Sequence, residues 1–305
     1  MNVHRSLENL NKKCGSLLLQ LNSSLMKNII AISCFVSFLV CFATLPLVAG
    51  DLTLNTRYQE RNDTDVFEVR KQQRSIPANQ TAIVVCDMWD KHWCKGATSR
   101  VAEMAPRMNE VINKAREQGV MIIHCPSSTM GFYEGTPGRK LALSAPVVEA
   151  KVPLQKWCHL DPDREAPLPI DDSDGGCDCE PQCENYQAWT RQIDTIEIHE
   201  GDAITDTAEA YNVMKERGIT NVIVMGVHMN MCVLGRPFSI RQMVYQDQNV
   251  FLMRDLTDTM YNSRMSPFVS HFKGNDLVAD HIEKYWCPTV TSVDILGGKP
   301  FEFQR

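Results

Sequence analysis

Short apolar runs alternate with amphipathic stretches along the chain from residue 81 to residue 293. The runs are rich in β-branched residues, a composition typical of strands that are buried on both faces of a sheet. The predicted strands are 81–86, 120–123, 192–198, 221–225, 249–253 and 289–293. Because helical patterns separate several of these runs, we expect parallel strands joined by right-handed crossovers.

Helical periodicity, together with start and stop residues, predicts the connecting helices. Pro106 suits a first helical position and Gly119 suits the position just past a helix end. A turn at 98–105 is expected to precede this helix. The predicted helices are 106–118, 206–218, the stretch that follows residue 232, and 276–285.

Three stretches fall outside this alternation. Residues 51–80 are polar and lack clear periodicity, which predicts an arm or linker with at most one edge strand, at 66–69. Residues 127–186 form a long proline-rich insertion within a predicted domain at 81–295, and residues 296–305 form a tail. Because long loops in compact domains are usually functional, we expect the insertion to be a lid.

The first 50 residues have the layout of a secretory signal peptide. A short positive start at Met26 precedes an uncharged apolar run at 29–48, and small residues follow at Ala49 and Gly50. We expect cleavage near these two residues and a periplasmic or secreted protein. The run is also long enough to serve as an uncleaved membrane anchor. Met26 is the expected true start of the chain.

The net charge limits the classes of partner. The chain has 31 Lys and Arg against 37 Asp and Glu, a formal charge of −6, and no basic stripe with interleaved aromatic residues. This balance argues against a nucleic-acid partner. A small-molecule substrate is expected, with membrane contact only through the signal sequence, and we expect a homo-oligomer.

Export also changes how the cysteines are interpreted. The mature chain keeps nine of them, Cys86, Cys94, Cys125, Cys158, Cys177, Cys179, Cys183, Cys232 and Cys287. In an oxidising compartment most should pair, and the odd number leaves a thiol, for which Cys232 is the candidate. Cys158, Cys177, Cys179 and Cys183 lie in the insertion, where two disulfides are predicted to staple the lid. Zinc binding by these four is the alternative.

Two strand ends carry candidate chemistry. Asp87 follows the strand at 81–86, and Cys232 lies in the turn between the strand at 221–225 and the next helix. Open α/β sheets bind ligands at the carboxyl ends of their strands. A cysteine at a helix start favours the thiolate, which is the nucleophilic form. The alternatives are an aspartate that only begins a turn and a buried structural cysteine.

These residues resemble the isochorismatase-like cysteine hydrolases, which include nicotinamidases and related amidases. The resemblance is carried by Val85-Cys86-Asp87, by the segment 192–199 and by Met225-Gly226-Val227-His228-Met229-Asn230-Met231-Cys232-Val233, and it covers about residues 80–293. It implies a three-layer α/β/α, Rossmann-like fold with an open, parallel, six-stranded sheet.

The resemblance also implies roles for particular residues. Asp87 and Cys232 occupy two positions of an Asp–Lys–Cys triad, and the peptide bond between Val227 and His228 corresponds to a cis bond. The amides of His228 and Cys232 are implied as the oxyanion hole. The metal signature of nicotinamidases, an Asp-x-His with a further His on the loop after the second strand, is not present as a whole, so neither a metal nor another cofactor is expected. Asp90 and His92 could bind a metal, but a plain polar contact is the more usual role of such a histidine.

The chain departs from the family at the lysine, which should end the strand at 192–198. Glu197 and His199 stand there instead, on one face of the predicted strand. A protonated His199 is our predicted substitute for the lysine, with Glu197 orienting it or contacting substrate. The candidate substrate-binding residues are Trp89, His92, Arg139 and Arg236. For the two arginines, a surface or ion-pair position is the alternative.

Together, these features predict an exported cysteine hydrolase that cleaves a small-molecule amide or a related C–N bond. Cys232 is expected to be the nucleophile, with a lowered thiol pKa, and Asp87 the base. The alternative is a binding module that kept the fold and lost the chemistry.

Overall fold

The computed structural model describes residues 50–304 of the 305-residue chain. The predicted signal peptide, apart from Gly50, and the start at Met26 lie outside the described residues. Within residues 50–304, no helix combines the length and the apolar character needed to cross a membrane.

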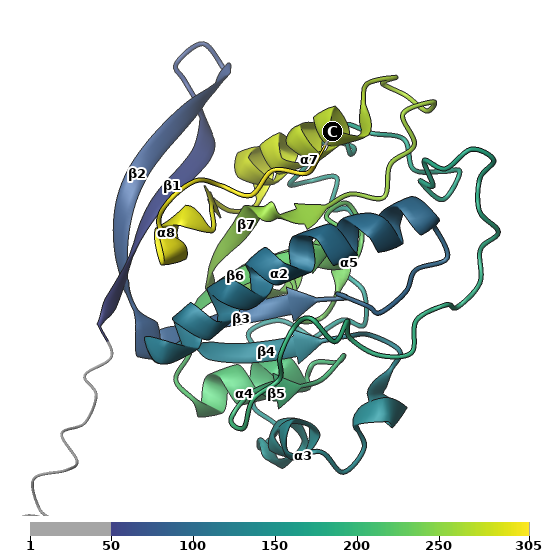
Figure 1. The fold of residues 1–305 in the computed structure, drawn as a ribbon. Coiled ribbons are helices and arrows are strands. Elements are labelled where there is room, and N and C mark those ends of the chain that lie inside the picture. The colour runs from purple at the N-terminus through teal and green to yellow at the C-terminus, as the bar shows by residue number, and fades with distance from the viewer. Residues whose placement is uncertain (1–49, 305) are drawn as a thin grey trace, which may run out of the picture. The chain divides into compact units, whose positions relative to one another are not determined.

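The sheet has eight strands in the order β2-β1-β8-β7-β6-β3-β4-β5 (Figure 1). The strands are β1 (Asp51–Arg61), β2 (Phe67–Pro77), β3 (Thr81–Cys86), β4 (Met121–Cys125), β5 (Ala203–Ile204), β6 (Asn221–Val227), β7 (Asn249–Asp258) and β8 (Thr289–Val290). Strands β3 to β8 are mutually parallel. The prediction of a six-stranded parallel sheet therefore holds for β3 to β8 and is wrong in omitting β1 and β2.

Strands β1 and β2 form an antiparallel hairpin where the sequence predicted a polar arm. Strand β1 joins the parallel sheet through the pair Arg57 and Thr289 at β8. Leu52, Leu54 and Thr56 are buried, and the residues between them are exposed. This period of two spans only a few residues and includes a threonine, which is why the apolar pattern did not reveal a strand.

The third parallel strand also differs from the prediction. Residues 192–198 form a loop, in which Gln192 makes only an isolated bridge with Trp89. The strand itself is β5, the two residues Ala203–Ile204 beside β4. Ile196 is buried within this loop and packs beneath helix α2, so an apolar run here fills the core without joining the sheet.

Helices cover both faces of the sheet. They are α2 (Lys95–Glu117), α3 (Pro137–Ser144), α4 (Glu209–Glu216), α5 (Cys232–Gly235), α6 (Ile240–Tyr245), α7 (His271–Tyr285) and α8 (Val293–Leu296), with 3-10 helices η1 (Ala78–Gln80) and η2 (Met130–Tyr133). Helix α2 includes the predicted turn at 98–105, and Pro106 lies on its exposed side. The helix after Cys232 is broken at Arg236 and Pro237, because proline limits the preceding backbone.

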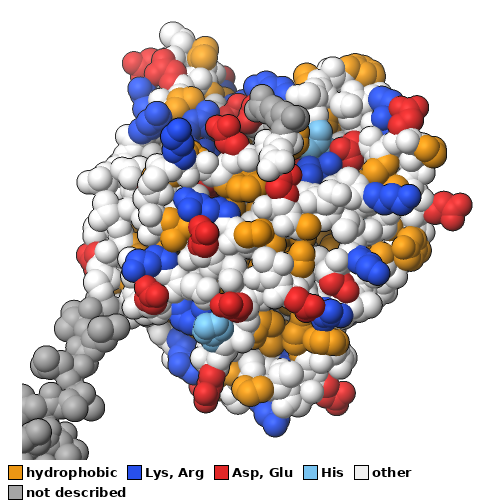
Figure 2. Space-filling model, viewed as in Figure 1, with side chains coloured by type: hydrophobic (Ala, Val, Ile, Leu, Met, Phe, Trp, Pro, Cys, Tyr) orange, Lys and Arg blue, Asp and Glu red, His pale blue; other side chains and the backbone are white. Residues whose placement is uncertain are grey.

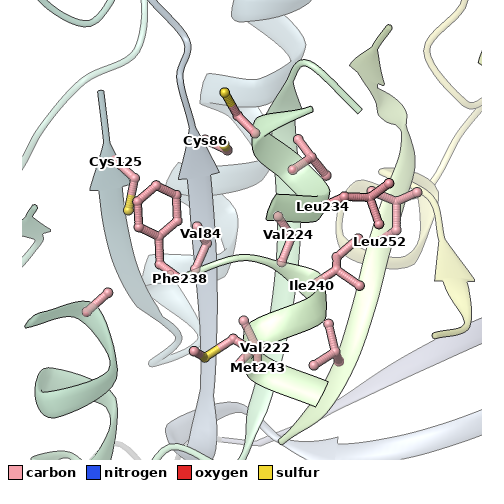
Figure 3. Packing of buried hydrophobic residues seen from close by; sticks show 14 of the residues in the cluster. Val84, Cys86, Cys125, Val222, Val224, Leu234, Phe238, Ile240, Met243 and Leu252 are labelled. Carbon is pink, nitrogen blue, oxygen red and sulfur yellow. The ribbon is translucent and has the colours of Figure 1, made fainter. Parts of the chain in front are cut away.

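The central strands send alternate side chains to two cores, which gives the predicted three-layer arrangement. Ala82, Val84 and Cys86 of β3 pack with residues of α4, α5, α6 and α7. Ile83 and Val85 of the same strand pack with α2 and α8 on the other face. Figure 3 shows the first core, where Phe238 lies beside Cys125 at the carboxyl end of β4.

The chain reverses its direction of winding between β3 and β6. From β3 it adds β4 and β5 on one side, and then returns to add β6, β7 and β8 on the other. Gly226, near the end of β6, has φ +111°, and a Cβ there would lie 2.0 Å from the Cys86 carbonyl oxygen. Only glycine permits this approach of β6 to β3. Crossovers that diverge at such a point leave a ligand-binding crevice at the carboxyl edge.

The insertion predicted at 127–186 begins with η2 and α3, and from residue 145 to residue 202 it contains no helix or strand. Among residues 50–304 no disulfide forms, so the predicted staple is not present in the structure. Cys158 lies apart, with its Sγ 3.4 Å from the Gln242 Oε1. The tail also packs on the domain, since the Phe301 amide donates to the Asp255 carboxylate.

A buried carboxylate anchors the insertion to the domain. Glu165 accepts hydrogen bonds from Arg241 (2.8 and 3.0 Å), His281 (2.8 Å) and Trp286 (2.8 Å). Burial alone would raise the pKa of Glu165, but these donors lower it to about 2. A carboxyl with a depressed pKa stabilises the fold above its ordinary pKa of 4.5 and loses that contribution as pH falls toward 2.

Charged side chains of both signs are interspersed on the face viewed in Figure 2. On helix α2, for example, Arg107 forms an ion pair with Glu110, and Lys114 forms one with Glu117. Such pairs contribute little to stability. Loss of a single charge in the buried Glu165 network should therefore destabilise the protein more than loss of a charge in one of these exposed pairs.

We predict that Glu165→Gln destabilises the protein by about 3–5 kcal/mol, because it leaves the buried Arg241 charge without its partner. The loss should appear at neutral pH in urea unfolding and shrink below about pH 4, where the Glu165 carboxyl of the unfolded wild-type chain takes up a proton while the native carboxylate, with its pKa of about 2, stays charged. Glu110→Gln, at an exposed ion pair of α2, is the matched control and should change stability by less than about 0.5 kcal/mol. Equal effects of the two substitutions would contradict the anchoring role.

Candidate active site

Asp87 is held rigidly at the carboxyl end of β3. Its side chain is fully buried, its φ is +47°, and its amide donates to the Cys125 carbonyl at 3.0 Å. The carboxylate Oδ1 accepts from the Ser127 amide at 2.7 Å. These bonds tie Asp87 to the end of β4 and leave its other oxygen, Oδ2, without a backbone partner.

Cys232 lies next to Asp87, at the first residue of α5. Its thiol is close enough to the Asp87 carboxyl for a hydrogen bond, and the side chain is 8% exposed. Asp87 Oδ2 is buried and has no well-directed hydrogen-bond partner among residues 50–304. Thiol and carboxyl are therefore adjacent but not yet aligned, as is common for catalytic pairs without a bound substrate.

Arg236 supplies a positive charge to the same pair. Its Nε lies 3.5 Å from Asp87 Oδ2, and its guanidinium interacts with the Cys232 thiol. Trp157 of the insertion packs over it, 5.5 Å from ring centroid to Cζ. The sequence suggested Arg236 as a substrate ligand; the structure places it on the protein's own acid and thiol. The sequence did contain a signal for this role, because Arg236 follows Cys232 by four residues, which is about one helical turn.

The charges at the site oppose thiolate formation in the free protein. Burial and the neighbouring Asp87 raise the pKa of the Cys232 thiol well above its ordinary value, while Arg236 lowers it. Burial also raises the pKa of Asp87, and Arg236 again acts in the opposite direction. The expectation of a depressed thiol pKa is therefore wrong. Helix α5 has only four residues, so its dipole offers little compensation.

Glu197 and His199 do not lie in the site. Because residues 192–198 form a loop before β5, these side chains lie away from the carboxyl ends of the strands. They are 53% and 48% exposed and contact each other, with His199 Nε2 3.3 Å from Glu197 Oε2. Asn113 of α2 donates to Glu197 at 3.0 Å. The argument for His199 as a lysine substitute assumed a strand that is not there.

The turn between β6 and α5 is held by backbone bonds. The bond between Val227 and His228 is cis, as the resemblance implied. The Met229 amide donates to the Asp258 carbonyl at 2.8 Å, and the Val233 amide donates to the His228 carbonyl at 3.2 Å. The amides of His228 and Cys232 flank this turn, and their role as an oxyanion hole stays a prediction.

Asn230, which sequence reasoning missed, fixes the same turn from its side chain. Its amide nitrogen donates to Asp172 (2.7 Å) and to the Met260 carbonyl (3.1 Å), and its oxygen accepts from the Met260 amide (2.8 Å). Asp172 belongs to an acidic segment of the insertion. Gly176 lets this segment approach, because a Cβ there would lie 2.3 Å from the Met260 oxygen.

Trp89 and His92, two of the predicted substrate-binding residues, belong to an aromatic group beside the turn. Trp89 stacks on Trp189 with ring centroids 4.4 Å apart, and its Nε1 donates to the Ser127 carbonyl. His92 meets His228 edge to face at 4.9 Å. Burial and the nearby charges lower the pKa of His92 to about 4 and hold that of His228 well below its ordinary value, so both rings are neutral near neutral pH.

Arg139 lies outside the site. Its guanidinium pairs with Glu209 at the start of α4 and donates to the Ile204 carbonyl at 3.4 Å. This contact ties α3 to α4 and leaves the arginine no free face toward Cys232. The ion-pair alternative for Arg139 is therefore the one that the structure supports.

No protein-family model matches the sequence, and no curated protein matches it. Among solved structures, the chain is similar to a cysteine hydrolase from Pseudomonas syringae pv. phaseolicola, with 16% identity, a TM-score of 0.44, and 72% of this chain and 92% of that chain covered. It is similar to N-carbamoylsarcosine amidase from Thermoplasma acidophilum, with 11% identity, a TM-score of 0.38, and 70% and 96% covered.

A ribonuclease from Caenorhabditis elegans, named MAR1, is another similar chain, with 12% identity, a TM-score of 0.41, and 73% of this chain and 84% of that chain covered. Several further similar structures are named as isochorismatase-family proteins. This is the family that the strand-end residues resemble. The reaction proposed below rests on this chain's own residues.

We predict that Arg236→Gln slows alkylation of Cys232 by iodoacetamide about tenfold or more near neutral pH. Loss of the neighbouring cation should raise the thiol pKa by about one unit or more, and each unit is a factor of ten in thiolate. Arg236→Lys should retain most of the wild-type rate. The measurement is peptide mass spectrometry of a labelling time course across pH.

His199→Ala serves as the control for this experiment and should leave the labelling rate unchanged, because its ring lies outside the site. Labelling in urea should be equal for all four proteins. A folded Arg236→Gln variant that reacts as fast as wild type would rule out the proposed role of Arg236.

Proposed function

We propose that this protein is a cysteine hydrolase that cleaves a small-molecule amide or a related C–N bond. The observation that carries the proposal is the packing of the Cys232 thiol against the buried Asp87 carboxyl, with Arg236 beside both. An acid, a cation and a thiol at the carboxyl edge of a parallel sheet, at its switch point, are the parts that nucleophilic acyl transfer needs.

The first half of the proposed reaction forms a thioester. Asp87 takes the thiol proton as Cys232 Sγ attacks the carbonyl carbon of the substrate. The carbonyl oxygen becomes an oxyanion, which the amides of His228 and Cys232 stabilise in the proposed mechanism. When the tetrahedral intermediate collapses, Asp87 returns the proton to the nitrogen, the C–N bond breaks and the amine leaves.

The second half releases the acyl group. Asp87 takes a proton from a water molecule, whose oxygen attacks the thioester carbon. Collapse of this second intermediate breaks the C–S bond, and the proton on Asp87 returns to the sulfur. The net reaction consumes one amide and one water and yields one acid and one amine, so the site begins each cycle in the same protonation state.

The raised thiol pKa fits proton transfer to Asp87 during attack better than a preformed thiolate. In the resting site, the cysteine keeps its proton because a second negative charge beside Asp87 is costly. Arg236 offsets that cost when the proton moves from sulfur to carboxylate, since it faces both groups. Neutral His92 and His228 leave Arg236 as the cation that interacts with the pair among residues 50–304.

The second candidate function is a binding module of the same fold without catalysis. Two observations favour it: Cys232 is almost completely buried, and the family's lysine is replaced by an arginine on a different element. In this case the thiol should stay inert in the folded protein. The resemblance of the strand-end residues to cysteine hydrolases, and the contact among Cys232, Asp87 and Arg236, favour the hydrolase.

The sequence also supports a proposal about where the protein acts. We propose that the chain is exported and that its signal peptide is cleaved near Ala49 or Gly50, on the basis of the apolar run that precedes them. A homo-oligomer stays a prediction. Sequencing the amino terminus of the mature protein and measuring its mass in solution test the two statements.

We predict that wild-type protein, offered a panel of small primary amides and N-carbamoyl compounds, releases ammonia from at least one of them. Quenched mixtures should contain a thioester on Cys232, identified by peptide mass spectrometry. Cys232→Ala should abolish turnover, and Asp87→Asn should lower kcat at least about a hundredfold, the lower range for a lost general base.

His199→Ala is the matched control, and it should keep wild-type kinetics. Absence of turnover and of any thioester across the panel, together with a Cys232 that does not react in the folded protein, would replace the hydrolase proposal with the binding-module alternative.

A further inference from the structure

Three cysteines that the proposed reaction does not use converge at the start of α2. The sulfur atoms of Cys94, Cys177 and Cys179 all lie within 4.8 Å of one another. Cys94 Sγ is 3.1 Å from Cys177 Sγ and 3.8 Å from Cys179 Sγ. Cys94 and Cys177 are completely buried, and Cys179 is half-buried. Two distant parts of the chain therefore bring three thiols to one point.

A fourth thiol lies next to this group. Cys183 packs against the same small core, which also contains Ala97 and Met260. Three residues separate Cys183 from Cys179, a spacing within the range found between paired zinc ligands. Cys183 is half-buried on the insertion and lies outside the group of sulfur atoms within 4.8 Å of one another, so its loop must move for its sulfur to join the other three.

The surroundings suit thiolates. The Gly96 amide donates to Cys179 Sγ at 3.3 Å, and Cys94 is the residue before the first turn of the 23-residue helix α2. A helix start favours negative charge, and amide hydrogen bonds to sulfur are the usual outer contacts of thiolate ligands. Gly96 is fitted to this place, because a Cβ there would lie 2.7 Å from the Asp178 carboxylate.

Two arginines hold the segment that carries Cys177 and Cys179. Arg100 of α2 forms an ion pair with the Asp178 carboxylate at 2.8 Å. Arg264 donates to the carbonyl oxygens of Asp178 (3.4 Å) and Cys179 (3.0 Å). These contacts fix the backbone that carries two of the three thiols.

We propose that Cys94, Cys177 and Cys179 bind one Zn²⁺ ion, with Cys183 completing a tetrahedral, closed structural site. Zinc–sulfur bonds of about 2.3 Å place tetrahedral sulfur ligands about 3.8 Å apart. The Cys94–Cys179 separation already has this value, and the Cys94–Cys177 separation opens by about 0.7 Å on binding. Each ligating thiol releases its proton to solvent, and no electron is transferred.

The rival arrangement is a disulfide between Cys94 and Cys177. A disulfide joins two sulfur atoms at about 2.05 Å and does not involve a third sulfur atom. The structure instead brings Cys179 as close to Cys94 as a shared ligand requires, and directs the Gly96 amide at its sulfur. The convergence of three thiols is therefore the observation that favours the metal.

The proposed metal would join the insertion to the candidate active site without entering the reaction. Asp178, between two of the ligands, pairs with Arg100, and Arg100 Nε pairs with Asp258 at 2.7 Å. The Asp258 carbonyl accepts from the Met229 amide in the turn before Cys232. Loss of the metal should loosen this chain of contacts and so expose the insertion to proteolysis.

The test measures metal and thiols in the full-length protein. Zinc per chain is determined by elemental mass spectrometry after dialysis, and unreduced samples are mapped for disulfides. Titration of metal-free protein with Co²⁺ under reducing conditions then reports tetrahedral thiolate ligation by its visible absorption. We expect about one zinc per chain, and absorption with cobalt that zinc abolishes.

Three variants separate the ligands from other cysteines. Cys179→Ser, on the half-buried side, should weaken zinc affinity at least about a hundredfold, since even the loss of an outer contact costs tenfold to a hundredfold. Cys183→Ser should weaken it too, and should leave three sulfur ligands in X-ray absorption spectra. Cys158→Ser, in the same insertion but bonded to Gln242, is the control and should bind zinc as wild type does.

A Cys94–Cys177 disulfide in metal-free protein would overturn the proposal. So would free thiols whose zinc and cobalt affinities are the same in wild type and Cys179→Ser. Cys232→Ala should bind zinc normally, so that a failure of the hydrolase proposal and a failure of the metal proposal give different results.

Discussion

The close approach of β6 to β3 is the constraint on which the site depends. At Gly226 the two backbones come so near that a methyl group would overlap the Cys86 carbonyl. This contact brings the residue after β3 and the turn after β6 together at the carboxyl edge of the sheet. Asp87 and Cys232 are 145 positions apart in the chain, and they meet because these two strands are neighbours at the point where the winding reverses.

Putting an acid beside a thiol in the protein interior creates an electrostatic problem, because burial raises the pKa of both groups and the Asp87 charge raises the pKa of the Cys232 thiol further. A cation that faces both relieves it. The position of that cation in the chain matters less than its position in space. Arg236, one turn after the cysteine, can therefore supply the same charge to the pair that a lysine at the end of another strand would supply. Its planar, permanently charged head also stacks on Trp157, which links the charge to the insertion that covers it.

The insertion has no regular structure from residue 145 to residue 202, so it cannot hold its shape through backbone hydrogen bonds alone. It is fixed instead at separate buried points: Glu165 among its donors, Asp172 on Asn230, and the thiol group at the start of α2. Each point brings polar or ionisable atoms out of water and satisfies them with specific partners. The turn before Cys232 contacts Asp172 directly and is linked to the thiol group through Asp258, Arg100 and Asp178, so the order of the insertion and the geometry of the site are coupled.

The sequence by itself determined the elements whose pattern is local and long. The strands β3, β6 and β7, the helices α2, α4 and α7, and the strand-end positions of Asp87 and Cys232 could be predicted, because a buried strand must be apolar at every position and a helix repeats its apolar face. The cis bond before His228 followed from a family resemblance. Short or mixed patterns failed: β1 alternates over only a few residues, and an apolar run at 192–198 filled the core as a loop.

Only the tertiary structure decided which charged and sulfur-bearing side chains meet. His199, chosen by its register on a predicted strand, points elsewhere once the strand is a loop, whereas Arg236 reaches the thiol. Cys94 joins Cys177 although 83 positions separate them, and Cys158 does not join its neighbours in the sequence. Such contacts depend on how the long insertion packs against α2 and α5. Side-chain contacts between distant segments leave no periodic trace in either segment, so no reading of the pattern could have found them.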